Sequence, residues 1–424
     1  MGAPDLSPLC AEFPGLARTE GGRPVVFADA PGGSQVPLGV IEAMAAYLRR
    51  SNANLGGPFA TSVESGLVVD EARRAGADLL GATPGEIVFG ANTTTVAFHL
   101  AHAFARTLSP RDEVVVTRLD HDANVAPWVG AATAAGATVR WVDIHEEDCT
   151  LDLKSLDRAL SSRTRLVAFT VASNAVGTIP PAAEIVRRVH DAGALAVADG
   201  VHFAQHGALD AATLGADVLF TSAYKFFGPH LGVAFISQEL LERWRPDKVR
   251  PLPDVGPERW ETGTQNHEAL AGMTAAVDYL ADVGERFGRP AGDDRRARVV
   301  AGMEAIRFHE AELSGRFLEA VAGIDGVRLW GIADPTRVAE RTPTFAVRVG
   351  GQHPRHTSEE LARRGVWVWD GNYFALEIME RLGLQQTGGT VRIGFCHYNT
   401  GDEVDRVLAE LDALARMEEG LLPA

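Results

Sequence analysis

Short apolar runs alternate with amphipathic segments from about Gly85 to Ser237. Most runs are rich in Val, Ile and Phe, residues that favour strands. Between several of them lie segments such as Ala182–Ala192, whose apolar residues recur at the spacing of one helix face. This alternation predicts an α/β fold with a mainly parallel sheet covered by helices, in which ligands bind beyond the carboxyl ends of the strands. The seven predicted strands are Glu86–Gly90, Glu113–Thr117, Thr138–Asp143, Arg165–Thr170, Ala194–Asp199, Asp217–Thr221 and Gly232–Ile236.

The pattern changes after Asp293, where a long charged amphipathic segment predicts a helix followed by two strands and a closing helix. These four elements are predicted at Arg295–Ala322, Thr344–Val349, Val366–Trp369 and Asp402–Met417. We therefore divide the chain into three parts. They are an N-terminal arm that packs with the small domain (residues 1–24), a large domain (25–294) and a small α+β domain (295–424).

The composition narrows the classes of function. The 424 residues include 40 Lys and Arg against 56 Asp and Glu, a net charge of −16, so we expect no nucleic-acid partner. The N-terminus has neither the basic flank nor the apolar run of a signal peptide, and no window approaches the roughly 18 apolar residues of a spanning helix. We expect a cytoplasmic protein without a membrane partner. The three cysteines lie far apart without metal-ligand spacing, which predicts structural thiols and no metal site.

Lysine is scarce in this chain, with only Lys154, Lys225 and Lys248 among the 40 basic residues. Lys154 and Lys248 lie in polar, loop-like segments. Lys225 lies between aromatic residues at the end of a second predicted strand, where loss of water lowers the pKa of an amine and favours its nucleophilic, neutral form. Lys225 is therefore the candidate for amine chemistry.

A carboxylate follows five apolar residues at the end of another predicted strand, at Asp199. Alone, such an Asp is as often a turn or helix-cap residue. Together with Lys225 at a neighbouring strand end, it matches the requirements of pyridoxal phosphate. A lysine holds that cofactor's aldehyde as a Schiff base, and an acid pairs with its pyridine nitrogen.

The cofactor's phosphate needs hydrogen-bond donors and a helix N-terminus. The segment from Gly90 to His99 supplies such a strand-to-helix junction, with Thr93 and Thr94 able to offer hydroxyl and backbone N–H groups. Alone, the segment would read as an ordinary helix cap. The chain has neither Gly-x-Gly-x-x-Gly nor a Gly-Lys pair that would indicate other phosphate-binding loops.

Nearly the whole chain, from about Phe27 to Met417, resembles the class V aminotransferase superfamily of fold-type I pyridoxal phosphate enzymes, and within it the cysteine desulfurase-like branch. Six ordered motifs carry this resemblance. They are Asp120-His-Asp-Ala-Asn-Val-Ala-Pro-Trp, Ser173-Asn-Ala-Val-Gly, Asp199-Gly-Val-His, Ser222-Ala-Tyr-Lys-Phe-Phe-Gly-Pro, Glu261-Thr-Gly-Thr-Gln-Asn and the segment from Arg392 to Thr400.

The resemblance implies a role for each matching residue. His121 would stack on the pyridine ring, and Asn174 and His202 would lie beside its 3-oxygen, His202 replacing a glutamine of the family. Ser222 with Thr93 or Thr94 would hold the phosphate, and Tyr224 replaces a histidine before Lys225. Thr264 would reach the phosphate of a neighbouring subunit, which implies a homodimer with shared active sites. Arg392 would clamp the α-carboxylate of the substrate. Apart from the motif matches, we expect Asn372 and Tyr373 to shape the substrate pocket, with solvated loop residues as the alternative.

Two departures from the desulfurases limit the assignment. Phe374 stands where their loop carries the catalytic cysteine, and we expect Cys396, in a strand-like run, to be a buried structural thiol. Trp369 stands where desulfurases often have a second arginine, which implies a more apolar pocket.

We therefore expect an enzyme that acts on an amino acid or amine through a Lys225 aldimine, with Lys225 removing the α-proton and Asp199 stabilising the quinonoid that results. We favour a desulfurase-like lyase (C–S or other β-elimination) without the persulfide cysteine. Transamination and epimerisation remain open, since the fold does not select the reaction, and a non-catalytic protein that binds pyridoxal phosphate is a further alternative.

Overall fold

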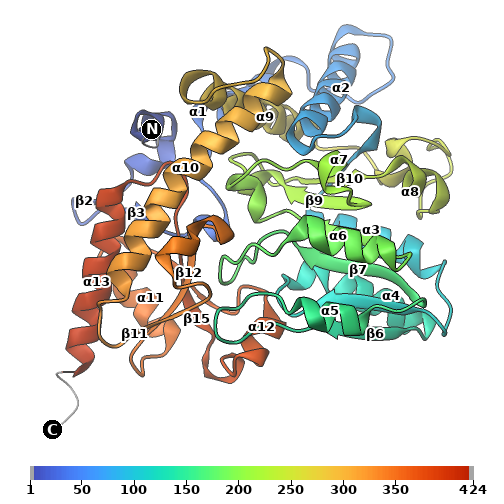
Figure 1. The fold of residues 1–424 in the computed structure, drawn as a ribbon. Helices are drawn as coiled ribbons and strands as arrows, with labels where there is room; N and C mark the ends of the chain where they lie inside the picture. The colour runs from blue at the N-terminus through green and yellow to red at the C-terminus, as the bar shows by residue number, and fades with distance from the viewer. Residues whose placement is uncertain (1–3, 420–424) are drawn as a thin grey trace.

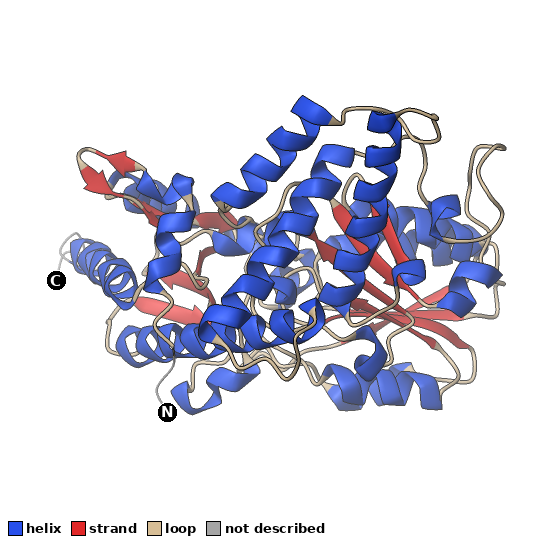
Figure 2. Cartoon of the chain, turned by 90° about the horizontal axis from the view of Figure 1, so that it is seen from above, coloured by secondary structure: helices blue, strands red, loops and turns tan. Residues whose placement is uncertain are grey.

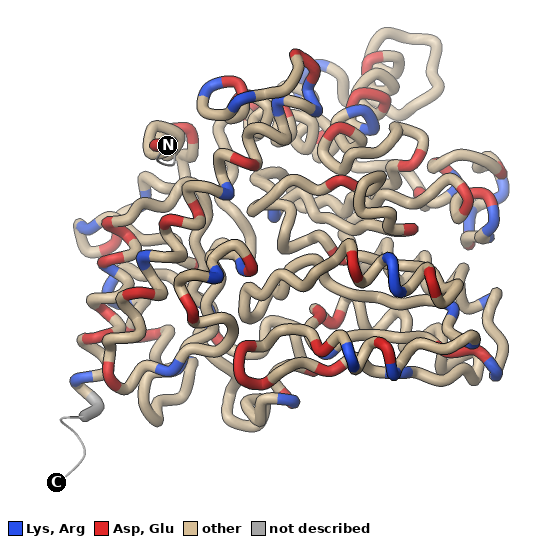
Figure 3. Tube along the Cα trace, in the orientation of Figure 1, with Lys and Arg blue, Asp and Glu red and all other residues tan. Residues whose placement is uncertain are grey.

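The computed structural model describes residues 4–419. The first three residues of the predicted N-terminal arm and the last five of the predicted small domain lie outside the described residues. Two sheets organise the chain, a larger one from its middle and a smaller one from its C-terminal third (Figure 1). Acidic and basic residues are interspersed along the outer helices (Figure 3). Over the described range, no helix combines the length and the apolar character that a membrane span needs.

The larger sheet has seven strands in the order β4-β10-β9-β8-β7-β5-β6. Strands β5 to β9 run parallel, whereas β10 is antiparallel to both of its neighbours. All seven predicted strands are present, each within one residue of its predicted ends, which confirms the predicted α/β fold. Their bounds are β4 Ile87–Gly90, β5 Glu113–Thr117, β6 Thr138–Val142, β7 Thr164–Thr170, β8 Leu195–Asp199, β9 Val218–Ser222 and β10 Gly232–Ile236.

Helices cover both faces of this sheet (Figure 2). Because side chains alternate along a strand, Val115 of β5 packs in one apolar core and Val114 and Val116 pack in the other. The helices of the first core include α1 Leu38–Arg50, α2 Ala60–Leu80, α5 Leu153–Ala159, α6 Ala182–Asp191, α7 Ala211–Leu214 and α9 His267–Phe287, and those of the second include α3 Thr93–Ala105, α4 Ala126–Ala135 and α8 Gln238–Arg243.

The smaller sheet is antiparallel, in the order β11-β12-β15-β14. The predicted strand Val366–Trp369 was wrong as one element, because the chain changes partners within it. Val366–Trp367 (β13) pairs with β3 near the N-terminus, and Trp369–Gly371 (β14) joins the smaller sheet. Cys396 lies beyond the end of β15, so its predicted strand-like setting was also wrong. The remaining elements are β11 Val327–Trp330, β12 Thr344–Val349, β15 Thr390–Gly394, α10 Arg295–Val321, α11 Pro354–Arg363, α12 Leu376–Arg381 and α13 Gly401–Glu419.

The N-terminal segment lies against both groups of elements. It contains β1 Thr19–Glu20, β2 Arg23–Pro24 and β3 Val26–Phe27. Phe13 packs edge-on against Tyr279 of α9, with ring centroids 5.6 Å apart, and against Tyr398 at 5.1 Å. Val26 shares an apolar core with the smaller sheet. The division of the chain at residues 24 and 294 stays a prediction.

Candidate active site

A cleft of about 690 Å3 opens beyond the carboxyl ends of strands β7, β8 and β9. Thr170, Asp199 and Ser222, the last residues of these strands, line it. Twelve of the thirteen predicted site residues line this one cleft. They are Thr93, Thr94, His121, Asn174, Asp199, His202, Ser222, Tyr224, Lys225, Asn372, Tyr373 and Arg392.

Lys225 lies three residues beyond β9, at the end of a short 3-10 helix, Ala223–Lys225. Its side chain is buried, and Nζ donates a hydrogen bond to the backbone carbonyl of Pro31. Burial, with the positive charge of Arg392, lowers the pKa of Lys225 to about 7, although the carboxylates of Asp199 and Asp29 oppose the shift. A substantial fraction of this amine is therefore neutral and nucleophilic near pH 7.

Asp199 is buried at the end of β8, and its Oδ1 accepts a hydrogen bond from the backbone N–H of Val201 at 2.8 Å. Burial raises the pKa of Asp199 to about 6, while the backbone hydrogen bond and Lys225 lower it. A second buried carboxyl, Asp120, accepts a hydrogen bond from Asn124 Nδ2 at 2.7 Å. Burial and the nearby Asp199 raise the pKa of Asp120. A positively charged ring nitrogen of a bound ligand would stabilise a buried carboxylate such as that of Asp199.

Two hydroxyl groups meet at the N-terminus of α3. Thr93 Oγ1 lies 2.5 Å from Ser222 Oγ and donates to the carbonyl of Thr221 at 2.7 Å. Strand β10 passes close beneath this turn, because a Cβ at Gly232 would lie 2.6 Å from the backbone nitrogen of Thr93. Backbone N–H groups at a helix start, together with hydroxyl groups, suit a phosphate. Thr94 lines the cleft beside them and is exposed.

His121 forms part of the cleft wall, and its Nδ1 accepts a hydrogen bond from the backbone N–H of Ala123 at 3.0 Å. Burial, with the charges of Lys225 and Arg392, lowers the pKa of His121 to about 4. The ring is therefore neutral at pH 7. A neutral imidazole of this kind is suited to stack on an electron-poor ring, which is the role that the resemblance implies.

Buried polar atoms of two predicted cofactor residues lack hydrogen-bond partners among the described residues. Asn174 Nδ2 donates to the carbonyl of Tyr373 at 2.9 Å, but its Oδ1 has no hydrogen-bond partner. His202 Nε2 lies 3.0 Å from Thr344 Oγ1, and its Nδ1 has no partner. Buried polar groups are normally satisfied, so these atoms indicate a missing polar ligand. Together with Asp199 and the Thr93 hydroxyl group, they fit pyridoxal phosphate.

Arg392 lies on β15 and is buried on the far side of the cleft. Its Nη1 donates to the carbonyl of Asn174 at 2.8 Å, and its guanidinium lies 4.3 Å from the ring centre of Tyr373. Burial lowers its pKa to about 10, which leaves it cationic at pH 7, and its Nε has no hydrogen-bond partner. The side chain thus keeps donors for a substrate carboxylate.

Asn372 and Tyr373 belong to the loop between β14 and α12. Asn372 Oδ1 accepts a hydrogen bond from the backbone N–H of Phe374 at 3.1 Å, and the hydroxyl of Tyr373 bonds to Thr390. Both side chains therefore hold the loop in place while lining the cleft. Their roles towards a substrate stay predictions.

Thr264 is the predicted site residue that the structure does not bring to this cleft. It is exposed in the loop between the 3-10 helix Pro257–Trp260 and α9. Its predicted contact is with a neighbouring subunit, and that role stays a prediction.

Sequence reasoning missed the contribution of the N-terminal segment. The carbonyl of Pro31 accepts the Lys225 hydrogen bond, and Gly32 lines the cleft. Asp29 is mostly buried, and burial raises its pKa to about 6 against the opposing charges of Arg392 and Lys225. An Asp between apolar residues and a Pro-Gly-Gly turn was the available signal for this contribution.

None of the three cysteines is among the residues that line the cleft in the described chain. All three are unpaired, and Cys149 and Cys396 are buried. Burial raises the pKa of each thiol, that of Cys149 to about 12. Such thiols are poor nucleophiles.

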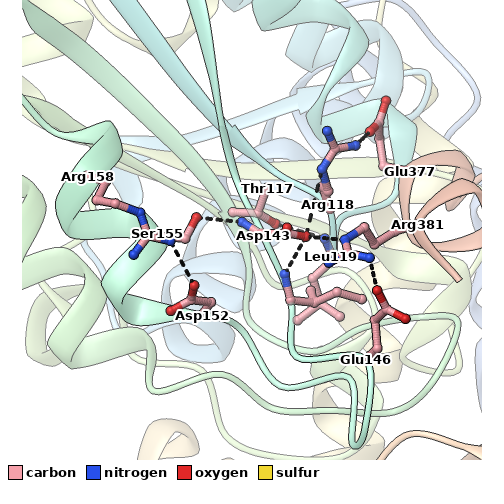
Figure 4. Close-up of polar contacts among 11 residues, drawn as sticks. Thr117, Arg118, Leu119, Asp143, Glu146, Asp152, Ser155, Arg158, Glu377 and Arg381 are labelled. Carbon is pink, nitrogen blue, oxygen red and sulfur yellow. Dashed lines mark hydrogen bonds and ion pairs between the residues drawn. The ribbon is translucent and has the colours of Figure 1, made fainter.

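The close-up in Figure 4 shows how Glu377 and Arg381 of α12, the helix after the loop that carries Tyr373 and Phe374, are tied to residues after β5 and β6. Arg118, after β5, pairs with Glu377 of α12. Arg381 at the end of α12 pairs with Asp143 at 2.8 Å and with Glu146. These ion pairs join the loops after β5 and β6 to the helix that follows the cleft loop.

Comparisons with known proteins agree with this geometry. Residues 26–288 and 296–407 match the family described as Aminotransferase class-V. A cysteine desulfurase from Dickeya dadantii is 30% identical over 423 residues, 96% of each chain. An uncharacterised protein from Mycobacterium tuberculosis is 30% identical over 390 residues, 92% of this chain and 95% of the relative. The apo structure of a cysteine desulfurase from Thermococcus onnurineus superposes with a TM-score of 0.83 and 27% identity, covering 94% of this chain and 95% of that one. This chain therefore belongs to the class V aminotransferase family, whose members are fold-type I enzymes dependent on pyridoxal phosphate.

Proposed function

We propose that this enzyme is a lyase that acts on an amino acid and eliminates a group from its β-carbon. The observation that carries the proposal is one cleft lined by a buried amine, Lys225, a buried carboxylate, Asp199, and a buried guanidinium, Arg392. Pyridoxal phosphate supplies, when bound, an aldehyde that condenses with amines and a ring that withdraws electrons from bonds to the α-carbon.

The chain's own groups divide the remaining work. Arg392 binds the α-carboxylate and so orients the α-carbon within the cleft. Lys225 Nζ accepts the α-proton in its neutral form, which its lowered pKa of about 7 makes abundant. Asp199 would hold the positive charge of the ring nitrogen, and His121 would pack on the ring. Thr93 and Ser222 would hold the phosphate at the start of α3.

Elimination is proposed ahead of the alternatives because of the likeness to cysteine desulfurases over nearly the full chain. In the proposed reaction Lys225 accepts the α-proton, and the β-substituent departs with its bonding electrons and a proton. Addition of water across the remaining skeleton then releases ammonia and a 2-oxo acid, so that one amino acid and one water give the protonated leaving group, ammonia and the 2-oxo acid. We propose that no persulfide forms. The resemblance implies that Phe374 takes the place of the family's cysteine, and none of the three thiols lines the cleft in the described part of the chain.

Replacement of the anchoring lysine tests the proposal. Lys225→Ala should abolish the covalent attachment of pyridoxal phosphate, read by mass spectrometry after borohydride reduction. Lys248→Ala is the matched control, because Lys248 pairs with Asp254 in a surface loop and should leave attachment intact. A reduced adduct that persists on another lysine in Lys225→Ala would refute the assignment.

The products separate the candidate reactions. A lyase releases ammonia and a 2-oxo acid without a second substrate, whereas an aminotransferase needs a 2-oxo acid acceptor and an epimerase only inverts the α-carbon. A protein whose visible cofactor absorption ignores every amino acid tried would be a non-catalytic binder.

We also propose that the enzyme is a homodimer with shared sites. Thr264 is exposed and lies outside the cleft of its own chain, which leaves it able to contact a second copy.

A further inference from the structure

Exposed aromatic side chains gather on the wall of the cleft. Trp369 is 51% exposed, Phe374 is 73% exposed and Phe98 is 41% exposed, and all three line the cleft. Aromatic side chains of this size are usually covered, and several together mark a binding surface. These three come from separate elements, β14, the loop after it and α3, so the fold brings them together at the cleft.

The position of Trp369 depends on two other elements. Trp369 of β14 pairs with Arg392 of β15. The indole therefore lies beside the arginine that is predicted to bind the substrate carboxylate. The indole also packs directly against Gly32, where an added Cβ would lie 2.1 Å from the ring nitrogen. Only glycine at position 32 allows this contact. The N-terminal segment therefore seats an aromatic ring beside Arg392.

The position of Phe374 is held by a strained loop. Tyr373 and Phe374 both have φ of +56°, a left-handed conformation that non-glycine residues rarely adopt. The Phe374 carbonyl accepts a hydrogen bond from the backbone N–H of Asp122 at 2.6 Å, and the Tyr373 carbonyl accepts one from Asn174. The Phe374 ring lies 5.6 Å from the ring of His121, inclined by 32°. This loop conformation places the Phe374 ring next to His121, the residue predicted to stack on the cofactor ring.

The charges around the cleft favour an uncharged side chain in the substrate. Lys225 and Arg392 are the Lys and Arg residues that line the cleft among the described residues, and both are assigned to the amine and carboxylate chemistry. Asp370 lines the cleft too, paired with Arg355 at 3.2 Å, and burial raises the pKa of Asp122. A second carboxylate on the substrate would meet these acids without a free cation.

We propose that Trp369 and Phe374 form a subsite for the side chain of an amino acid that is aromatic and uncharged. The α-carboxylate of this amino acid would be bound by Arg392, and its side chain would pack between the indole and the phenyl ring. This subsite rests on the proposed function, and it goes further by naming the class of substrate.

Titration of the cofactor-loaded protein with L-phenylalanine, L-alanine and L-aspartate tests the subsite. Binding is read from the change in visible absorption of the cofactor. We expect L-phenylalanine to bind roughly tenfold more tightly than L-alanine, as befits one ring packed against two, and L-aspartate to bind no better than L-alanine.

Variants then locate the preference. Trp369→Ala and Phe374→Ala should each weaken L-phenylalanine binding about fivefold to tenfold and leave L-alanine binding unchanged. Trp369→Phe should retain the preference, and Trp369→Arg should improve L-aspartate binding. Phe308→Ala is the matched control, an exposed aromatic residue of α10 that does not line this cleft.

Three results would overturn the subsite. One is equal affinity of the wild type for the three amino acids, and another is unchanged L-phenylalanine binding in both alanine variants. The third is a change in the oligomer mass of an alanine variant, measured by light scattering, without a change in its affinity for L-phenylalanine. The two rings would then belong to an interface between chains. Failure of every amino acid to alter the absorption would overturn the proposed function and the subsite with it.

Discussion

Single residues in this cleft are held in states that folding alone would not favour. Asp199 is a carboxylate with 7% of its surface exposed, and Lys225 is an amine with 6% exposed. The pKa of Asp199 rises to about 6 and that of Lys225 falls to about 7, mainly because burial penalises the charged form of each. Such opposed shifts in one cleft are typical of catalytic groups. Burying the charged forms makes the cofactor-free protein less stable than it would be with neutral side chains at these positions.

The cost of the buried carboxylate gives a prediction with a definite sign. The pKa of Asp199 is about 6 in the folded chain against 3.8 for an unburied Asp, so the folded form holds its proton to higher pH. Stability is therefore lost as pH rises from about 4 to 6 and stays lost above that range. At pH 8 the loss is roughly 3 kcal/mol, from about 1.4 kcal/mol for each tenfold change in proton affinity.

Asp199→Asn removes this carboxylate but keeps the acceptor for Val201. We expect the cofactor-free variant to melt at a higher temperature than the cofactor-free wild type at pH 8, with a smaller difference at pH 5. Cofactor binding should become roughly tenfold to hundredfold weaker, because the charged hydrogen bond is lost. Calorimetry and absorbance titration measure the two effects. Asp191→Asn, on the exposed end of α6, is the control, and equal melting of variant and wild type at pH 8 would contradict the prediction.

At the scale of elements, the sequence pattern predicts those strands and helices that depend on residues close together in the sequence. Strands β5, β8, β9 and β10 of the larger sheet are buried almost throughout and read as nearly continuous apolar runs, so their ends are predictable to within a residue. The split between β13 and β14 was not predictable, because Val366 and Trp369 take partners distant in sequence. The Pro31 carbonyl was missed for the same reason, since its contact with Lys225 spans 194 residues.

The residues of the candidate site also fall into two groups, those with a signal in the local sequence and those placed by long-range packing. Lys225 and Asp199 carried signals in their own neighbourhoods, a charged group at or near the end of an apolar strand, and motif matches identified the residues around them. Asp29 has a similar local pattern, an Asp after an apolar run and before a Pro-Gly-Gly turn, but that pattern does not show its closeness to Arg392 and Lys225, which arises from packing of the N-terminal segment. Strain at Tyr373 and Phe374 is likewise a property of the folded loop.

Helices α1 and α2 carry an unusual stripe of exposed apolar residues. Phe59, which caps α2, and Val63 and Leu67 within it recur at the four-residue spacing of one helix face, and each is more than half exposed. On α1, Leu48 is 50% exposed. Other exposed apolar residues on α1 and in the loop after it are Leu38, Ile41 and Leu55. An apolar area on two successive helices is typical of a contact between subunits, and it supports the proposed homodimer.

Charge placed in this stripe should therefore separate the subunits. We expect the double variant Leu48→Glu with Val63→Glu to elute as a monomer at concentrations where the wild type is a dimer, because two carboxylates would be buried without partners. Phe308→Glu, an equally exposed apolar position on α10, should leave the dimer intact. Light scattering after gel filtration gives the masses, and an unchanged dimer in the double variant would place the interface elsewhere.

On the scale of the whole molecule, one wall of the cleft is held across the two sheets. The loops after β5 and β6 belong to the larger sheet, while α12 follows the loop that carries Tyr373 and Phe374. The ion pairs of Arg118 and Arg381 connect them (Figure 4). Their partly exposed side chains make each pair worth about 0.2–1 kcal/mol, so the effect is small on stability but concentrated on the position of one loop.

Removal of these pairs should therefore affect the substrate more than the cofactor. In the double variant Arg118→Gln with Arg381→Gln, we expect amino acids to bind about threefold to tenfold more weakly, since loss of roughly 1 kcal/mol loosens the wall. Cofactor affinity should change little, because the hydroxyl groups predicted to hold the phosphate, those of Thr93 and Ser222, are positioned by each other and by the carbonyl of Thr221. Absorbance titration of the cofactor-loaded protein measures both constants.

Salt provides an independent check on that interpretation. High salt screens exposed ion pairs, with a screening length of about 3 Å in 1 M NaCl. At this salt concentration the wild type should bind amino acids about as weakly as the double variant. The affinity of the double variant for amino acids should respond little to salt. Arg187→Gln removes an equivalent pair within α6, between Arg187 and Asp191, and should behave as wild type. If the double variant and the wild type remained equally sensitive to salt, the wall would be held by the hydrogen bonds of the loop, such as that from Asp122 to Phe374, and the ion pairs would have no part in substrate binding.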